Sequence, residues 1–169
     1  MSSSFKETAG YLIGFIVFIL TIPWLMFHLA GRPACAPWQE VCFTVFAAAG
    51  LGLSVWSVVY MKKVGKGNPL DAFNHEIGPR TSRLLTGGPY RLCRNPMLLG
   101  VFLYYAGLQL YLMSGLACLL FLAFVFVMLL QVKKEEQRLE HDFGRAYLEY
   151  RQSTHAFLPR FGKSRRKKI

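Results

Sequence analysis

PMLLGVFLYYAGLQLYLMSGLACLLFLAFVFVMLLQV, residues 96–132, is the longest stretch of this sequence without a charged side chain. A helix needs about 20 residues to cross a hydrocarbon core about 30 Å thick, so the stretch is long enough for nearly two crossings. Met113, Ser114 and Gly115 interrupt its middle, and serine and glycine favour a tight reversal. The stretch therefore predicts a hairpin of two membrane helices.

Two further apolar runs precede this hairpin, at residues 11–30 and 41–61, and each has the length of a membrane helix. The sequence of 169 residues is 53% hydrophobic and only 17% charged, which is too apolar for an ordinary soluble domain. We therefore predict one all-α integral membrane domain over residues 1–169, with about four transmembrane helices.

Basic residues are unequally shared between the connecting segments. Arg32 is the single Lys or Arg between the first two apolar runs, whereas residues 62–94 hold seven. Because positively charged loops stay on the cytoplasmic side, residues 62–94 are expected to be cytoplasmic. An even number of crossings then places both chain termini, like residues 62–94, on the cytoplasmic side of a multi-pass membrane protein.

The C-terminal segment, residues 161–169, carries a cluster of Lys and Arg within a chain of net charge +11. Such a cluster could bind nucleic acid or anionic lipid head groups. Beside a membrane, each basic residue gains about 1 kcal/mol from the lipid surface. This favours the lipid bilayer as the partner of the tail, and we expect no nucleic acid.

The segment Ala34-Cys35-Ala36 resembles a signal-peptide cleavage site, but the apolar run before it is longer than the usual 7 to 15 residues. We therefore interpret that run as a retained membrane helix. Cys35 and Cys42 would lie near the outer face, where a disulfide could form. The cysteines and histidines show no metal-ligand spacing, so no metal is predicted.

The polar segment before the hairpin, residues 81–100, reads TSRLLTGGPYRLCRNPMLLG. Polar residues next to a membrane helix suggest a binding or catalytic site. Gly87, Gly88 and Pro89 predict a tight turn whose backbone could offer hydrogen bonds close to a ligand. Pro96 is expected in the first position of the third crossing, where its missing N–H costs nothing.

Beyond the hairpin, the helical pattern continues into the charged run KKEEQRLEHD, residues 133–142. Apolar residues there recur at spacings of three and four, which predicts an amphipathic C-terminal helix in the cytoplasm. Taken alone, Glu135 and Glu136 are interpreted as solvated charges. The residues of the apolar face are Leu139, Phe143, Tyr147 and Tyr150.

Two motifs in this order carry a family resemblance. The first has the form G-x-Y-x-x-x-R-[HN]-P, and the second has the form E-E-x-x-L followed by F-G-x-x-Y-x-x-Y, with Leu158-Pro159 as a closing element. Together they resemble the isoprenylcysteine carboxyl methyltransferase and phospholipid methyltransferase families, over about residues 82–160. The matching residues are Gly88, Tyr90, Arg94, Asn95 and Pro96, and then Glu135, Glu136, Leu139, Phe143, Gly144, Tyr147 and Tyr150.

The resemblance implies a membrane methyltransferase that uses S-adenosylmethionine without a Rossmann domain. It divides the chain into two N-terminal helices (1–61), a cofactor-binding catalytic part (62–160) and a basic tail (161–169). Cofactor contacts are implied for Leu84, Leu85, Tyr90, Asn95, Pro96 and Glu135, with Arg94, Leu98 and Glu136 as neighbours.

These residue types suit that cofactor, which combines a sulfonium, an amino-acid group, a ribose and a flat adenine. Glu135 or Glu136 can bind the ribose hydroxyls or the ammonium, while Tyr90 can enclose the adenine. Methyl transfer is a direct displacement, so positioning and exclusion of water supply most of the acceleration. An amine acceptor would also need a base, for which His75, His141 and a carboxylate remain open.

Three positions depart from the family pattern and leave the acceptor open. Asn95 replaces a common histidine, and Leu98 replaces a tyrosine. Gln131 stands where carboxyl methyltransferases place an arginine that binds the substrate carboxylate. The expected acceptor is therefore an amphiphilic or lipid-like molecule, with carboxyl and amine methylation both open.

Two other classes fit the outline of the sequence. A membrane sterol-type reductase would bind NADPH and could hold its phosphate with Arg80, Arg83 and Arg91. A non-enzymatic membrane scaffold would need no pocket at all.

Overall fold

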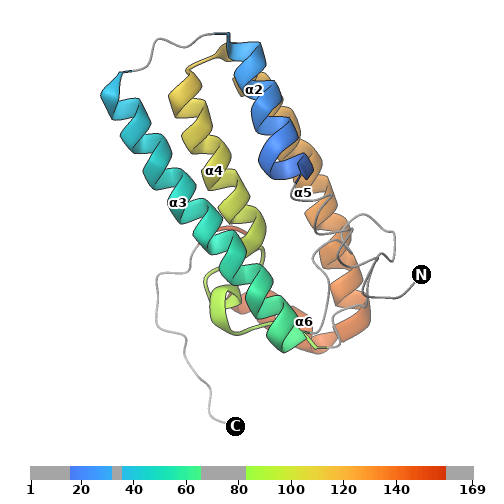
Figure 1. Cartoon of the computed structure of the whole chain (residues 1–169). Coiled ribbons are helices and arrows are strands. Elements are labelled where there is room, and N and C mark those ends of the chain that lie inside the picture. The colour runs from blue at the N-terminus through green and yellow to red at the C-terminus, as the bar shows by residue number, and fades with distance from the viewer. Residues whose placement is uncertain (1–15, 32–35, 66–82, 159–169) are drawn as a thin grey trace, which may run out of the picture.

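The computed structural model describes residues 16–31, 36–65 and 83–158, and the regular elements of these residues are all helices (Figure 1). This confirms the all-α class. A π-helical turn, Ile16–Thr21, leads into α2, and a second one, Met61–Gly65, extends α3. A short 3-10 helix, η4, precedes α4. The bounds are Ile22–Ala30 for α2, Pro37–Tyr60 for α3, Gly88–Arg91 for η4, Pro96–Leu112 for α4, Gly115–Phe143 for α5 and Arg145–Ser153 for α6.

The predicted hairpin is present as α4 and α5. Met113 ends α4 in a left-handed conformation with φ 48°, and its N–H donates to the Gln109 carbonyl at 2.9 Å. The side chain of Ser114 then caps α5 by accepting from the Ala117 N–H. The Gln109 amide donates to the Ser114 carbonyl at 2.9 Å. The reversal therefore lies at the predicted residues, with its carbonyls satisfied locally.

The start of α3 differs from the predicted apolar run. The helix begins at Pro37, ahead of the expected Val41, because the sequence holds a cap that hydropathy does not register. The Gln39 side chain accepts the Ala36 N–H at 2.6 Å and donates to the Leu110 carbonyl at 3.2 Å. Gln39 thereby satisfies the first turn of α3 and ties it to the end of α4.

The predicted C-terminal helix is broken in two. One helix through residues 133–150 was expected, but α5 continues only to Phe143 and α6 begins after Gly144. Gly144 has φ 49°, a positive value that glycine adopts at little cost, and its N–H donates to the Glu140 carbonyl at the end of α5. The break allows α6 to turn back under the bundle, with Tyr147 and Tyr150 buried (Figure 1).

Two helices in the described part of the chain have the length and composition to cross a membrane, Pro37–Gly65 and Gly115–Phe143. Only 11% and 22% of the residues in their most apolar windows are buried. The core helix of a soluble protein would be mostly buried, so these exposed apolar faces suit lipid contact. Ile16–Ala30 and α4 are apolar but shorter, and the count of four crossings stays a prediction.

The tightest packing joins α3 to α4. A Cβ atom on Gly100 would overlap the Gly50 carbonyl oxygen, and one on Gly50 would overlap the Gly100 carbonyl oxygen. The Ser54 hydroxyl donates to the Met97 carbonyl at 2.9 Å across the same contact. The small residue Gly50 thus lets α3 approach α4 closely, as small residues do between membrane helices. Gly52 faces open space instead.

A buried tyrosine joins the remaining helices. Tyr105 on α4 is fully buried, stacks on Phe124 of α5 with ring centroids 4.8 Å apart, and donates its hydroxyl to the Phe18 carbonyl at 2.8 Å. Met26 of α2 belongs to the same core. Cys42 on α3 is a free cysteine, whereas Cys35, its possible disulfide partner, lies outside the described residues, as do His75, Arg80 and the basic tail.

Replacing Gly100 with Ala should lower the free energy of unfolding by on the order of 1–3 kcal/mol, because the added methyl forces α3 and α4 apart. Thermal unfolding in detergent, followed by circular dichroism, measures the effect. Gly52→Ala is the matched control, since its methyl enters open space and alanine favours helix. Equal midpoints for the two variants would contradict the close crossing.

Candidate functional site

The two motifs meet at one end of the bundle. There α3 ends, η4 and the start of α4 follow, and the last turns of α5 approach α6 (Figure 1). Residues 83–95 form an elbow between the described end of α3 and the start of α4. The elbow, the end of α5 and α6 together define the candidate site.

A tyrosine of α3 covers the glycine turn of the elbow. Cβ atoms on Gly87 or Gly88 would overlap the Tyr60 side chain, and Gly88 has φ 55°. The Tyr90 N–H donates to the Gly87 carbonyl at 3.1 Å, closing the turn on itself. The glycines therefore make room for Tyr60, whose ring centroid lies 6.2 Å from that of Tyr90. The turn therefore has a packing role, and its expected backbone hydrogen bonds to a ligand stay a prediction.

Tyr90 connects the elbow to α6. Its side chain is buried, and its carbonyl accepts the Tyr150 hydroxyl at 2.7 Å. Leu85 is also buried, whereas Leu84 is half-buried. Pro96 is fully buried and begins α4 in the predicted first position.

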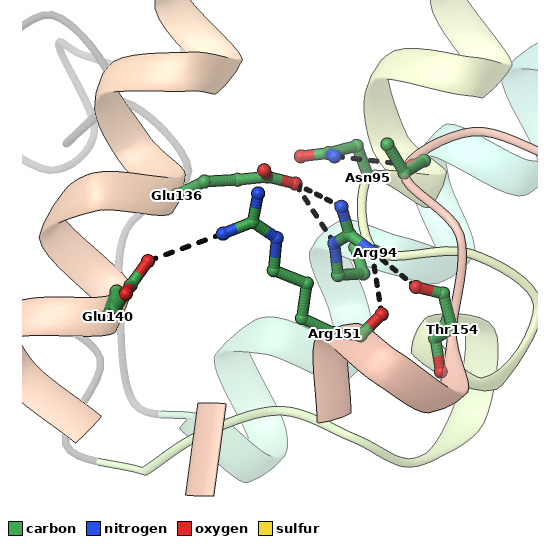
Figure 2. A network of polar contacts seen from close by, with 7 residues as sticks. Arg94, Asn95, Glu136, Glu140, Arg151 and Thr154 are labelled. Atoms are coloured by element: carbon green, nitrogen blue, oxygen red, sulfur yellow. Dashed lines mark hydrogen bonds and ion pairs between the residues drawn. The ribbon is translucent and has the colours of Figure 1, made fainter. Parts of the chain in front are cut away.

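Arg94 is bonded to three separate parts of the chain (Figure 2). Its Nε and Nη2 atoms both donate to Oε1 of Glu136, at 2.9 and 2.7 Å. Its Nη1 atom donates to the carbonyl of Arg151 at 3.3 Å and to the carbonyl of Thr154. The Arg94 and Glu136 side chains are only 11% and 17% exposed, so little water competes for them.

The segment after α6 runs along the same corner. The Arg94 N–H donates to the His155 carbonyl at 2.9 Å, and the Asn95 N–H donates to the Ala156 carbonyl at 3.1 Å. The Asn95 side-chain amide donates to the same Ala156 carbonyl at 3.2 Å (Figure 2). We name this group of contacts, centred on Arg94 with Glu136 and residues 154–156, the Arg94 clasp.

Glu135, the other member of the acidic pair, lies close to Tyr90. Burial raises the pKa of Tyr90, and the negative charge of Glu135 is the next cause of that rise. Glu135 also pairs with Arg138 one turn later at 3.9 Å, a long contact between partly exposed groups. Such a pair contributes little. The two carboxylates therefore have different surroundings, one inside the Arg94 clasp and one beside Tyr90.

Tyr147 of α6 is buried next to both carboxylates. Burial raises its pKa to about 12, Glu136 adds to the rise, and Arg94 and Arg151 oppose it. The side chain is 1% exposed, and within the described part of the chain its hydroxyl has no hydrogen-bond partner. The sequence placed this residue on an apolar face without giving it a polar role.

The remaining predicted site residues lie at varying depth. Leu98 packs against the hydrophobic core between the helices. Gln131 is half-buried on α5, one turn before Glu135. In the described residues, no three His, Cys, Asp or Glu side chains gather as a metal site.

The elements and the site together define a class, a small helical membrane protein with a polar site at one end of its bundle. A model of the phospholipid methyltransferase family matches residues 41–146, which is more than half of the chain. The chain therefore belongs to the phospholipid methyltransferase family, and the resemblance carried by the two motifs is confirmed.

One curated relative is a protein-S-isoprenylcysteine O-methyltransferase of Rattus norvegicus. It is 29% identical over 127 residues, which cover 72% of this chain and 44% of the relative. This chain thus spans less than half the length of that relative. No solved structure matches the chain.

Replacing Arg94 with Ala should destabilise the fold by on the order of 3 kcal/mol, because Glu136 then keeps a buried charge without its partner. Thermal unfolding in detergent measures the loss. Arg145→Ala is the control, since the Arg145–Glu149 pair is 92% and 68% exposed and should contribute no more than about 1 kcal/mol. A loss as small as that of the control would show that the Arg94 clasp is not structural.

Proposed function

We propose that this protein transfers a methyl group from S-adenosylmethionine to an amphiphilic acceptor in the membrane. The observation that supports this most is the meeting of the two motifs. Arg94 and Glu136 are 42 positions apart in the chain, yet their side chains bond at 2.7 Å. The helical hairpin of α4 and α5 separates them in sequence. Because the chain reverses between these helices, the two motifs meet at the open end of the hairpin and form one polar site.

The residues at this site suit the cofactor. Glu135 provides a partly exposed carboxylate for the ribose hydroxyls or the ammonium group. Tyr90 lies beside Glu135 and, with Leu85 of the same elbow, would provide apolar surface for the adenine. When bound, the cofactor supplies an electrophilic methyl group on a sulfonium.

The Arg94 clasp suggests different roles for the two carboxylates. The carboxylate of Glu136 forms an ion pair with Arg94 and accepts two hydrogen bonds from it, so Glu136 positions α5 against the elbow. Glu135 then faces the ligand. By the same argument, Arg94 and Asn95 act as positioning residues, because their polar groups bind residues 151–156.

The acceptor would enter sideways from the bilayer. The exposed apolar faces of α3 and α5 are suited to lipid, and the site lies at the end of these helices (Figure 1). We propose four crossings, with both termini and the site on the cytoplasmic side, from the distribution of basic residues. Gln131 would approach the acceptor from α5, and both carboxyl and amine methylation remain open. The comparisons give no support to the reductase alternative.

Replacing Glu135 with Ala should weaken the binding of S-adenosylhomocysteine by on the order of 1.5–3 kcal/mol, the loss of a charged hydrogen bond. Isothermal titration calorimetry on purified protein in detergent measures the dissociation constant. Glu149→Ala is the control, because that carboxylate is exposed and pairs with Arg145 on the outer side of α6. An unchanged constant in Glu135→Ala would remove this residue from the site.

The proposed function itself is tested with the unsubstituted protein. S-Adenosylhomocysteine should bind, and NADPH should not. Incubation with membrane extract and methyl-labelled cofactor should then label a lipid-soluble product. Binding of NADPH alone would indicate a reductase, and binding of neither molecule would indicate a scaffold.

A further inference from the structure

Tyr147 carries a buried hydroxyl that the fold does not use. Its side chain is 1% exposed, and no partner for the hydroxyl exists among the described residues. Two other buried tyrosines do have partners, since Tyr150 donates to the Tyr90 carbonyl and Tyr105 donates to the Phe18 carbonyl. A phenylalanine would fill the same space as Tyr147 without leaving a donor unpaired, so packing alone does not explain the hydroxyl.

The position of Tyr147 is fixed by its neighbours on α6. Tyr150, one turn later, is hydrogen-bonded to the elbow, and the Arg151 carbonyl accepts from Arg94. The Tyr147 and Tyr150 rings meet at 64° with centroids 6.4 Å apart. Tyr147 thus packs against Tyr150, close to the charges of Glu136 on α5 and Arg94 on the elbow.

The charges around Tyr147 are those of the candidate site. Glu136, Arg94, Arg151 and Glu135 all act on its pKa, which is raised to about 12. At physiological pH the hydroxyl is therefore protonated and can donate a hydrogen bond. The partner that the Tyr147 hydroxyl lacks is therefore a hydrogen-bond acceptor, such as an oxygen atom.

We propose that the Tyr147 hydroxyl donates a hydrogen bond to an oxygen of the bound S-adenosyl cofactor. This inference rests on the proposed function and adds a ligand contact that the motif resemblance did not supply. Two parts of the cofactor carry such oxygens, the carboxylate of the amino-acid group and the ribose. A buried ordered water is the competing partner.

The test compares Tyr147→Phe with Tyr150→Phe, which removes the neighbouring hydroxyl. Tyr147→Phe should raise the dissociation constant of S-adenosylhomocysteine about tenfold in calorimetry. It should leave the thermal midpoint of the ligand-free protein unchanged or higher, because no bond within the protein is lost. Tyr150→Phe should lower that midpoint, since the bond to the Tyr90 carbonyl disappears.

The same variants titrated with 5′-methylthioadenosine, which lacks the amino-acid group, identify the oxygen. Weaker binding of S-adenosylhomocysteine alone points to the carboxylate, and weaker binding of both ligands points to the ribose. Both results support the inference. Unchanged constants for both ligands overturn it, and so does a midpoint lowered as far as in Tyr150→Phe, which indicates a structural water.

Failure of this inference is distinguishable from failure of the proposed function. If the unsubstituted protein does not bind S-adenosylhomocysteine, both are overturned. If it binds, and Glu135→Ala weakens binding while Tyr147→Phe does not, only the role of Tyr147 is overturned.

Discussion

The arrangement of the candidate site depends on the guanidinium of Arg94. It lies where the elbow meets the ends of α5 and α6, and it bonds to Glu136 on α5, to Arg151 on α6 and to Thr154 just after α6 (Figure 2). Guanidinium suits this position because its five donors form a planar fork that several acceptors can share. With Glu136 it makes a largely desolvated ion pair, so separating the partners would leave an uncompensated charge.

This constraint gives the acidic pair two roles. One carboxylate is committed to holding the protein together, and its neighbour remains beside the buried ring of Tyr90. Adjacent positions on a helix point in directions about 100° apart, so they naturally meet different surroundings. From the sequence alone, the two glutamates were interpreted as solvated charges. In the structure Glu136 holds the fold together, and Glu135 is the candidate binding residue.

The helical framework could be predicted from the sequence because its causes are local. The length of residues 96–132 and the Ser114-Gly115 reversal predicted α4 and α5, and Pro96 marked the start of α4. The start of α3 was missed because Gln39 acts as a cap through a side-chain contact. Residue hydropathy carries no information about such contacts.

The residues that meet at the site were predicted from the sequence, but the hydrogen bonds that connect them were not. The resemblance brought Tyr90, Arg94 and the acidic pair together, as the structure does. The bonds from Arg94 and Asn95 to His155 and Ala156 involve main-chain carbonyls, which any residue supplies, so no sequence signal marks them. The turn at Gly144 could have been expected, since a glycine after a helical run often ends it.

A double-mutant cycle on Arg94→Met and Glu136→Gln, read out as the binding free energy of S-adenosylhomocysteine, tests the central claim most directly. If the Arg94 clasp assembles the cofactor site, each single change should weaken binding, and the double change should cost less than their sum by at least about 1 kcal/mol. Losses that add to within about 0.5 kcal/mol would contradict this account, as would the absence of binding to the unsubstituted protein.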